Sequence, residues 1–237
     1  MSLLYLVRHG QADRLGKNYD TLTELGRLQS KLLGEYFLSQ RIEFDSVYTG
    51  ALNRQKQTAE GIISAFETER FCIPAPLEES AWDEFDSKLW LGLAAKIRSV
   101  DLKFAELYEA YKSAWEQGSE KTRDYFQELI QIVLKKWVGA DFGDTEPYTF
   151  LEFIEKVQSG FFQIPKDVKS TLVVSSSTPI AIAMGLACDL EPKQIPIFMK
   201  SITNTSLSIF KRKGEIWEPI SWNAVPHLKD PDLITIV

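Results

Sequence analysis

The chain has 237 residues, of which 44% are hydrophobic and 25% are charged, values typical of a folded globular protein and not of a disordered one. The formal net charge of -6 and the pI near 5.2 argue against a surface for nucleic acid or an anionic membrane, because both would be repelled. An anionic ligand therefore needs a local basic pocket.

The sequence shows no recognisable targeting or membrane segment. No apolar run approaches membrane-spanning length, and the first residues lack the basic stretch and cleavage pattern of a signal peptide. The two cysteines, Cys72 and Cys188, favour a reduced compartment over a disulfide-stapled secreted protein. We therefore expect a cytoplasmic location.

The first part of the chain alternates between strand and helix patterns. Residues 3–7 are a continuous apolar run, typical of a strand buried on both faces of a parallel sheet, and residues 44–50 indicate a second strand. Residues 19–40 and 51–66 have helical spacing. This order predicts an α/β fold with a parallel sheet. In the first helix Leu25, Leu28, Leu32 and Leu33 mark the apolar positions, and Thr21 or Thr23 is its candidate cap.

The pattern changes near residue 86. Residues 88–117 and 121–138 are long amphipathic helical patterns with no strand between them, so we expect a helical insertion at about 86–145 within a single domain spanning 1–237. One stripe of the first pattern is expected to be a packing face and not a ligand site. It comprises Phe104, Leu107, Tyr108, Tyr111 and Trp115.

The α/β pattern then returns. Residues 148–164 predict a helix, and residues 170–190 predict a strand, a polar turn and a helix. Residues 203–223 predict two antiparallel strands joined around Lys213 and Gly214.

Chemically active side chains follow the first strand directly. Arg8, His9 and Gly10 stand at its carboxyl end, where open α/β sheets bind ligands. A neutral imidazole can attack a phosphoryl group, and a neighbouring arginine can hold two phosphate oxygens. Arg54 begins the helix after the second strand, where its charge adds to the backbone donors of a helix N-terminus. A chance triplet and a solvated arginine are the alternatives.

Several segments resemble the histidine phosphatase superfamily, in its phosphoglycerate-mutase-like branch. They are LVRHG at 6–10, LTELGRLQ at 22–29, and TGALNR at 49–54 with QTA at 57–59. Asn204-Thr205-Ser206 and Asn223 with His227-Leu228 are also similar, so the resemblance covers roughly 1–86 and 146–237. It implies a three-layer sandwich with a mostly parallel central sheet, into which the helical segment is inserted.

The resemblance also implies phosphoryl transfer without a metal or cofactor. By position, His9 would become phosphorylated, Arg8 and Arg54 would hold the phosphate, and a carboxylic acid would protonate the leaving oxygen. Glu84 in WDEFD fits the family pattern of that acid over more positions, and Glu79 stays an alternative. The acid needs a raised pKa, which partial burial can provide.

One family position departs from the pattern. The second histidine normally follows a strand as Ser-His-Gly-Gly, whereas here Ser176 stands in its place. A hydroxyl can donate to phosphate but brings no positive charge, and loss of such a donor typically costs a factor of about 10² to 10³ in rate. We expect Ser176 to contact phosphate, with helix capping as the alternative. His227, the other histidine, is expected to pack and not to catalyse.

These features predict a phosphomonoesterase of reduced activity that acts on a small phosphorylated substrate, with no nucleic-acid or membrane partner. The alternative is a catalytically silent protein of the same fold that binds a phosphorylated ligand or a protein. A mutase is less expected, because residues 11–14 depart from the mutase pattern, and a serine hydrolase at Ser176 lacks the flanking glycines. We expect Lys17, Arg98 and Arg123 to be solvated, with contact to the substrate as the alternative.

Overall fold

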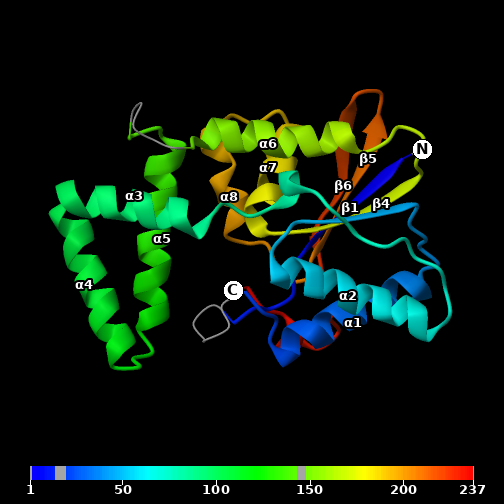
Figure 1. Ribbon diagram of the computed structural model, residues 1–237, viewed down its shortest axis with the longest axis horizontal. Coiled ribbons are helices and arrows are strands. Elements are labelled where there is room, and N and C mark those ends of the chain that lie inside the picture. Colours follow the sequence, from blue (N-terminus) through cyan, green and yellow to red (C-terminus); the bar gives the residue numbers. More distant parts are fainter. Residues whose placement is uncertain (1, 14–19, 143–147, 237) are drawn as a thin grey trace. The chain divides into compact units, whose positions relative to one another are not determined.

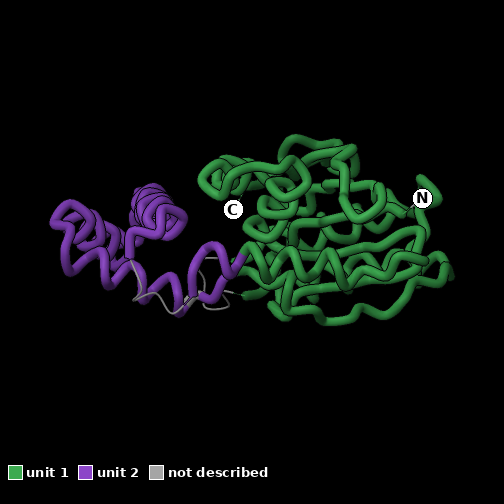
Figure 2. The backbone as a smooth tube through the Cα atoms, turned by 90° about the horizontal axis from the view of Figure 1, so that it is seen from above, with its two compact units in different colours: residues 1–84, 154–237 green, residues 85–153 purple. Residues whose placement is uncertain are grey.

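The computed structural model describes residues 2–13, 20–142 and 148–236. The chain divides into two compact units, Met1–Glu84 with Ile154–Val237 and Phe85–Phe153 (Figure 2). Within the described ranges, no helix has the length and apolar character needed to cross a membrane.

The larger unit is built on a six-stranded sheet of order β3-β2-β4-β1-β5-β6 (Figure 1). Strands β3, β2, β4 and β1 are parallel, whereas β5 runs antiparallel to both β1 and β6. The predicted mostly parallel sheet and the closing antiparallel pair are confirmed. Strand β3 was not predicted, because two residues are too few to show the alternation of polar and apolar side chains that marks a strand. The strands are β1 (Leu3–Arg8), β2 (Ser46–Thr49), β3 (Leu77–Glu78), β4 (Ser170–Ser175), β5 (Leu207–Lys213) and β6 (Ile216–Ala224).

Helices cover both faces of this sheet, which makes three layers (Figure 1). On one face lie α1 (Glu24–Ser39) and α2 (Asn53–Thr68), and on the other lie α7 (Ser177–Ala187) and the part of α6 (Phe150–Gln163) that belongs to this unit. The expected sandwich is therefore confirmed. Shorter elements of this unit are η1 (Ser80–Trp82), η3 (Pro192–Gln194), α8 (Pro196–Met199) and η4 (Pro231–Leu233).

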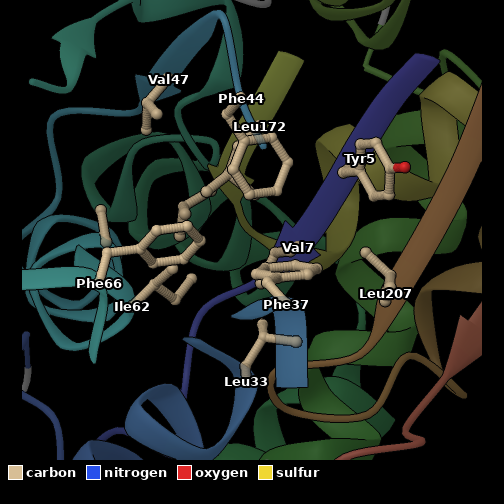
Figure 3. Packing of buried hydrophobic residues seen from close by; sticks show 12 residues of the cluster. Tyr5, Val7, Leu33, Phe37, Phe44, Val47, Ile62, Phe66, Leu172 and Leu207 are labelled. Atoms are coloured by element: carbon tan, nitrogen blue, oxygen red, sulfur yellow. The ribbon is translucent and has the colours of Figure 1, made fainter. Parts of the chain in front are cut away.

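The core between the sheet and the α1–α2 layer is aromatic and aliphatic (Figure 3). Phe37 packs edge-on against Phe44, with ring centroids 5.0 Å apart. Because each such side chain contributes about 1.5–3 kcal/mol when fully buried, this layer holds β1 and α2 against each other. The cluster comprises Tyr5, Val7, Leu33, Phe37, Phe44, Val47, Ala59, Ile62, Phe66, Leu172, Val174 and Leu207.

Helix α1 buries a different face from the predicted leucine stripe. Thr23 does cap it, accepting from the Gly26 amide at 3.1 Å. Leu28, however, is 44% exposed, whereas Gln29 and Ser30 are buried. The prediction was wrong at Leu28 because the helix turns polar groups inward, toward hydrogen-bond partners described below.

The smaller unit contains α3 (Ser87–Val100), α4 (Leu102–Glu116) and α5 (Thr122–Val138). The continuous pattern over 88–117 is divided at Asp101, whose backbone is extended and whose carboxylate accepts from the Phe104 amide at 3.1 Å to start α4. Phe104 is buried and Tyr111 stacks on Phe126, as expected of a packing face, whereas Trp115 is half exposed.

Candidate active site

His9 and Ser176 follow two adjacent parallel strands. The register pairs Arg8, the last residue of β1, with Ser175, the last residue of β4. The His9 amide donates to the Ser175 carbonyl at 2.9 Å. The next residue of each strand, His9 and Ser176, therefore lies at the same edge of the sheet.

The His9 imidazole is buried and held through both ring nitrogens. Nδ1 lies 2.8 Å from the Gly10 carbonyl oxygen, and the Nε–H of Arg54 donates to Nε2 at 3.2 Å. A carbonyl only accepts, so Nδ1 carries the proton, and Nε2 accepts with its lone pair. This arrangement selects the neutral tautomer in which Nε2 is the nucleophilic nitrogen.

Arg54 is the second residue of α2, and its position is set by Asp20. The Arg54 Nη1 donates to the Asp20 Oδ1 at 2.8 Å, and the Asn53 amide donates to Oδ2 at 2.8 Å. One carboxylate thus caps the N-terminus of α2 and holds the guanidinium beside His9. Sequence reasoning missed Asp20, because an aspartate in a loop gives no signal that it will be paired.

Arg8 is also buried, at 2% exposure, and it is anchored differently. Its Nη1 donates to the Ile202 carbonyl, in the segment before β5. The structure therefore joins Arg54 to the His9 ring, while it fixes Arg8 through the backbone of that segment.

Ser176 is 1% exposed and stands at the N-cap position of α7, yet its side chain makes no capping bond to the helix backbone. The capping alternative is thus wrong. Its Oγ instead accepts from the Nε2 of Gln55 at 3.0 Å. Gln55 directly follows Arg54, so consecutive residues of α2 contact Ser176 and His9. The same amide donates to the Trp82 carbonyl at 3.0 Å, which fixes its orientation.

The two candidate acids occupy different places. The Oε2 of Glu84 accepts from the Thr178 amide at 3.3 Å, in the first turn of α7 and two residues beyond Ser176. The Oε1 of Glu79 accepts from the Ala81 amide at 3.1 Å and caps η1. Glu84 is therefore the carboxylate linked to the same helix N-terminus as Ser176.

His227 is buried and structural, as the sequence suggested. Its Nε2 lies 2.9 Å from the Thr205 Oγ1, and that hydroxyl donates to the Asn204 carbonyl at 2.8 Å. The single hydroxyl proton is thereby used, so His227 must donate from Nε2. Burial lowers the pKa of His227 to about 4, which keeps the ring neutral.

Three further basic residues were expected to be solvated. Arg98 lies over the Tyr108 ring, 4.6 Å from its centroid, and Arg123 is exposed; Lys17 lies outside the described residues. Over 2–13, 20–142 and 148–236, no three His, Cys, Asp or Glu side chains are grouped as metal ligands.

Comparisons with known proteins agree with this fold. The model of the histidine phosphatase superfamily (branch 1) matches residues 4–225. A curated relative, the 2,3-bisphosphoglycerate-dependent phosphoglycerate mutase of Bartonella henselae, is 37% identical over 70 residues. That match spans 27% of this chain and 34% of the relative, so it covers about a third of the relative's length.

Solved structures of low sequence identity share the fold over nearly the whole chain. YhfR of Bacillus stearothermophilus has a TM-score of 0.66 at 18% identity, covering 97% of this chain and 100% of that one. Phosphoserine phosphatase of Entamoeba histolytica, solved with 3-phosphoglyceric acid, has a TM-score of 0.64 at 20% identity, covering 96% and 100%. Phosphoglycerate mutase of Bacillus anthracis has 0.62 at 16%, covering 96% and 95%.

Proposed function

Because the chain belongs to the histidine phosphatase superfamily, branch 1, we propose that it is a phosphomonoesterase that transfers a phosphoryl group first to His9 and then to water. The observation that carries this proposal is the buried, neutral His9 whose Nε2 faces the Arg54 guanidinium at 3.2 Å. Phosphoryl transfer needs a positioned nucleophile and cations around the transferred group, and this pair provides both.

In the proposed reaction, the His9 Nε2 attacks phosphorus and the ester oxygen leaves. The Nε–H of Arg54 then donates its hydrogen bond to a phosphate oxygen instead of to the ring nitrogen, while Nη1 stays bound to Asp20. The Nδ1–H bond to the Gly10 carbonyl stabilises the positive charge that develops on the imidazole. Water then attacks the phosphohistidine, which releases phosphate and returns the neutral ring.

We propose Glu84 as the acid that protonates the leaving oxygen and then as the base that takes a proton from water. It accepts from the α7 amide of Thr178, two residues beyond Ser176, whereas Glu79 is used to cap η1. These contacts support Glu84 over Glu79 as the proposed acid.

Ser176 is proposed as a phosphate donor in place of the family's second histidine. Its Oγ accepts from Gln55, and among the residues that the structure describes its own proton has no acceptor. A buried hydroxyl proton without an acceptor is costly, and a phosphate oxygen would satisfy it. Ser176 brings no positive charge, which supports a reduced turnover of a small phosphorylated substrate.

A catalytically silent, phosphate-binding protein is the second candidate. Two observations favour it: Ser176 is neutral, and Asp20 offsets the charge of Arg54 at 2.8 Å. A mutase has less support, because residues 11–14 depart from the mutase pattern.

A cytoplasmic location stays a prediction. Cys72 and Cys188 are both exposed as free thiols, which is compatible with a reducing compartment.

The test is hydrolysis of an aryl phosphate at mildly acidic pH by the wild-type protein and by His9→Ala. We expect phosphate release by the first and none by the second. The chain has two histidines, so His227→Gln is a matched control that should retain turnover. Equal activity in His9→Ala contradicts the proposed mechanism.

A further inference from the structure

The first peptide group after His9 is held on both sides. Its carbonyl oxygen, on His9, accepts from the Asn204 Nδ2 at 3.1 Å, and its N–H, on Gly10, donates to the Thr58 Oγ1 at 2.9 Å. Asn204 and Thr58 are both fully buried. This peptide plane therefore cannot rotate without losing hydrogen bonds that water does not replace.

The second peptide group sets the direction of the imidazole. Its carbonyl, on Gly10, accepts from the His9 Nδ1 at 2.8 Å, and its N–H, on Gln11, donates to the Gln29 Oε1 at 2.9 Å. Gln29 has no exposed surface. Because Gly10 holds the ring proton, the plane that Gln29 fixes decides which nitrogen of His9 is the nucleophile.

The side-chain amides of Gln29 and Asn204 are oriented by one hydroxyl, that of Thr235. The Gln29 Nε2 donates to the Thr235 Oγ1 at 3.0 Å and to the Leu233 carbonyl at 2.7 Å. The Thr235 Oγ1 in turn donates to the Asn204 Oδ1 at 3.0 Å. Because the Nε2 of Gln29 and the Oδ1 of Asn204 are engaged in these bonds, Gln29 must present its Oε1 to the Gln11 amide, and Asn204 must present its Nδ2 to the His9 carbonyl.

We propose that Thr235 is a positioning residue for His9. It acts through Gln29 and Asn204 and touches no reacting atom, so its loss should reduce the fraction of molecules with the productive ring orientation. The inference rests on the proposed role of His9 as nucleophile. Misplacement of a reacting group lowers the rate more than the affinity.

The kinetic test compares Thr235→Val, which keeps the shape but lacks the hydroxyl, with Thr235→Ser, which keeps the hydroxyl. We expect Thr235→Val to lower kcat by about tenfold with KM within about twofold, and Thr235→Ser to be close to wild type. Thr68→Val, which loses an exposed hydroxyl bonded within α2, is the control. All assays are run well below the unfolding midpoint of each variant.

A second readout separates this inference from the proposed function. The imidazole nitrogen spectrum has signals from two histidines, which His227→Gln assigns. We expect one tautomer of His9 in the wild type, protonated at Nδ1, and a mixture in Thr235→Val. If the wild-type chain hydrolyses no phosphate ester, the proposed function fails, and these spectra still decide the role of Thr235. An unchanged His9 spectrum in Thr235→Val, or an unchanged kcat in an active protein, overturns it.

Discussion

The Nε–H of Arg54 donates to the Nε2 of His9 across 3.2 Å, although the two residues are 45 positions apart. The contact exists because β1 ends, and α2 begins, at the carboxyl edge of the sheet. Asp20 holds the same guanidinium through its Nη1, at 2.8 Å. Because Arg54 already contacts the proposed nucleophile His9, a small shift of its guanidinium would bring it to the phosphate of a bound substrate.

Arg54→Lys should lower kcat/KM by about 10² to 10³. A lysine has one charged nitrogen, which cannot bond to Asp20 and the phosphate with the geometry of the guanidinium. Steady-state kinetics with the aryl phosphate measure the effect. Arg27→Lys, at an exposed position of α1, should be unchanged; activity of Arg54→Lys within threefold of wild type would contradict the assignment of Arg54.

Asp20→Asn should lower kcat by about tenfold without raising KM. The amide oxygen can still accept from the Asn53 amide, but the ion pair that directs Arg54 is lost. Freed of its carboxylate partner, Arg54 attracts the anionic substrate at least as strongly, so the change is confined to turnover. A raised KM with unchanged kcat would show that Asp20 does not position Arg54.

Changes at Ser176 distinguish a weakened enzyme from a silent one. Ser176→Ala removes the proposed donor to phosphate and should weaken binding of inorganic phosphate by about tenfold, as the loss of a hydrogen bond to a charged group does. Ser176→His adds the missing imidazole and should raise turnover. Calorimetry and aryl phosphate hydrolysis give the two readouts. Phosphate binding by the wild type and by Ser176→His, with no turnover in either, would favour the silent alternative.

The stability of the protein should fall in acid partly because of His227. Burial lowers its pKa from 6.5 to about 4, so the unfolded chain binds a proton more readily between these pH values. The contribution of His227 to the free energy of unfolding is therefore fully present above pH 6.5 and is lost as the pH falls toward 4. The pKa difference corresponds to about 3 kcal/mol. His227→Gln has no such titration. Urea unfolding between pH 7.5 and 4.5 should show a flatter profile for the variant; parallel profiles would refute the assignment.

The sequence predicted the fold and the central pair of the site for definable reasons. Continuous apolar runs and capped amphipathic helices are strong local signals, and side chains at strand ends meet because parallel strands end at one edge. His9 and Arg54 were found in this way.

Polar side chains that position this site were missed. Asp20, Gln29 and Gln55 resemble surface residues in sequence, and their contacts depend on partners distant in the chain. Gln29 even lies next to Leu28, which the helical pattern favoured for the core. Only the three-dimensional arrangement shows that its amide oxygen meets the Gln11 amide at 2.9 Å.

The most direct measurement is the mass of the intact protein, quenched in the neutral to alkaline range during turnover of an aryl phosphate. The account predicts one added phosphoryl group, labile in acid and located on the peptide that contains His9. A protein that turns over the substrate without forming this adduct, or that carries the phosphoryl group on another residue, would contradict it.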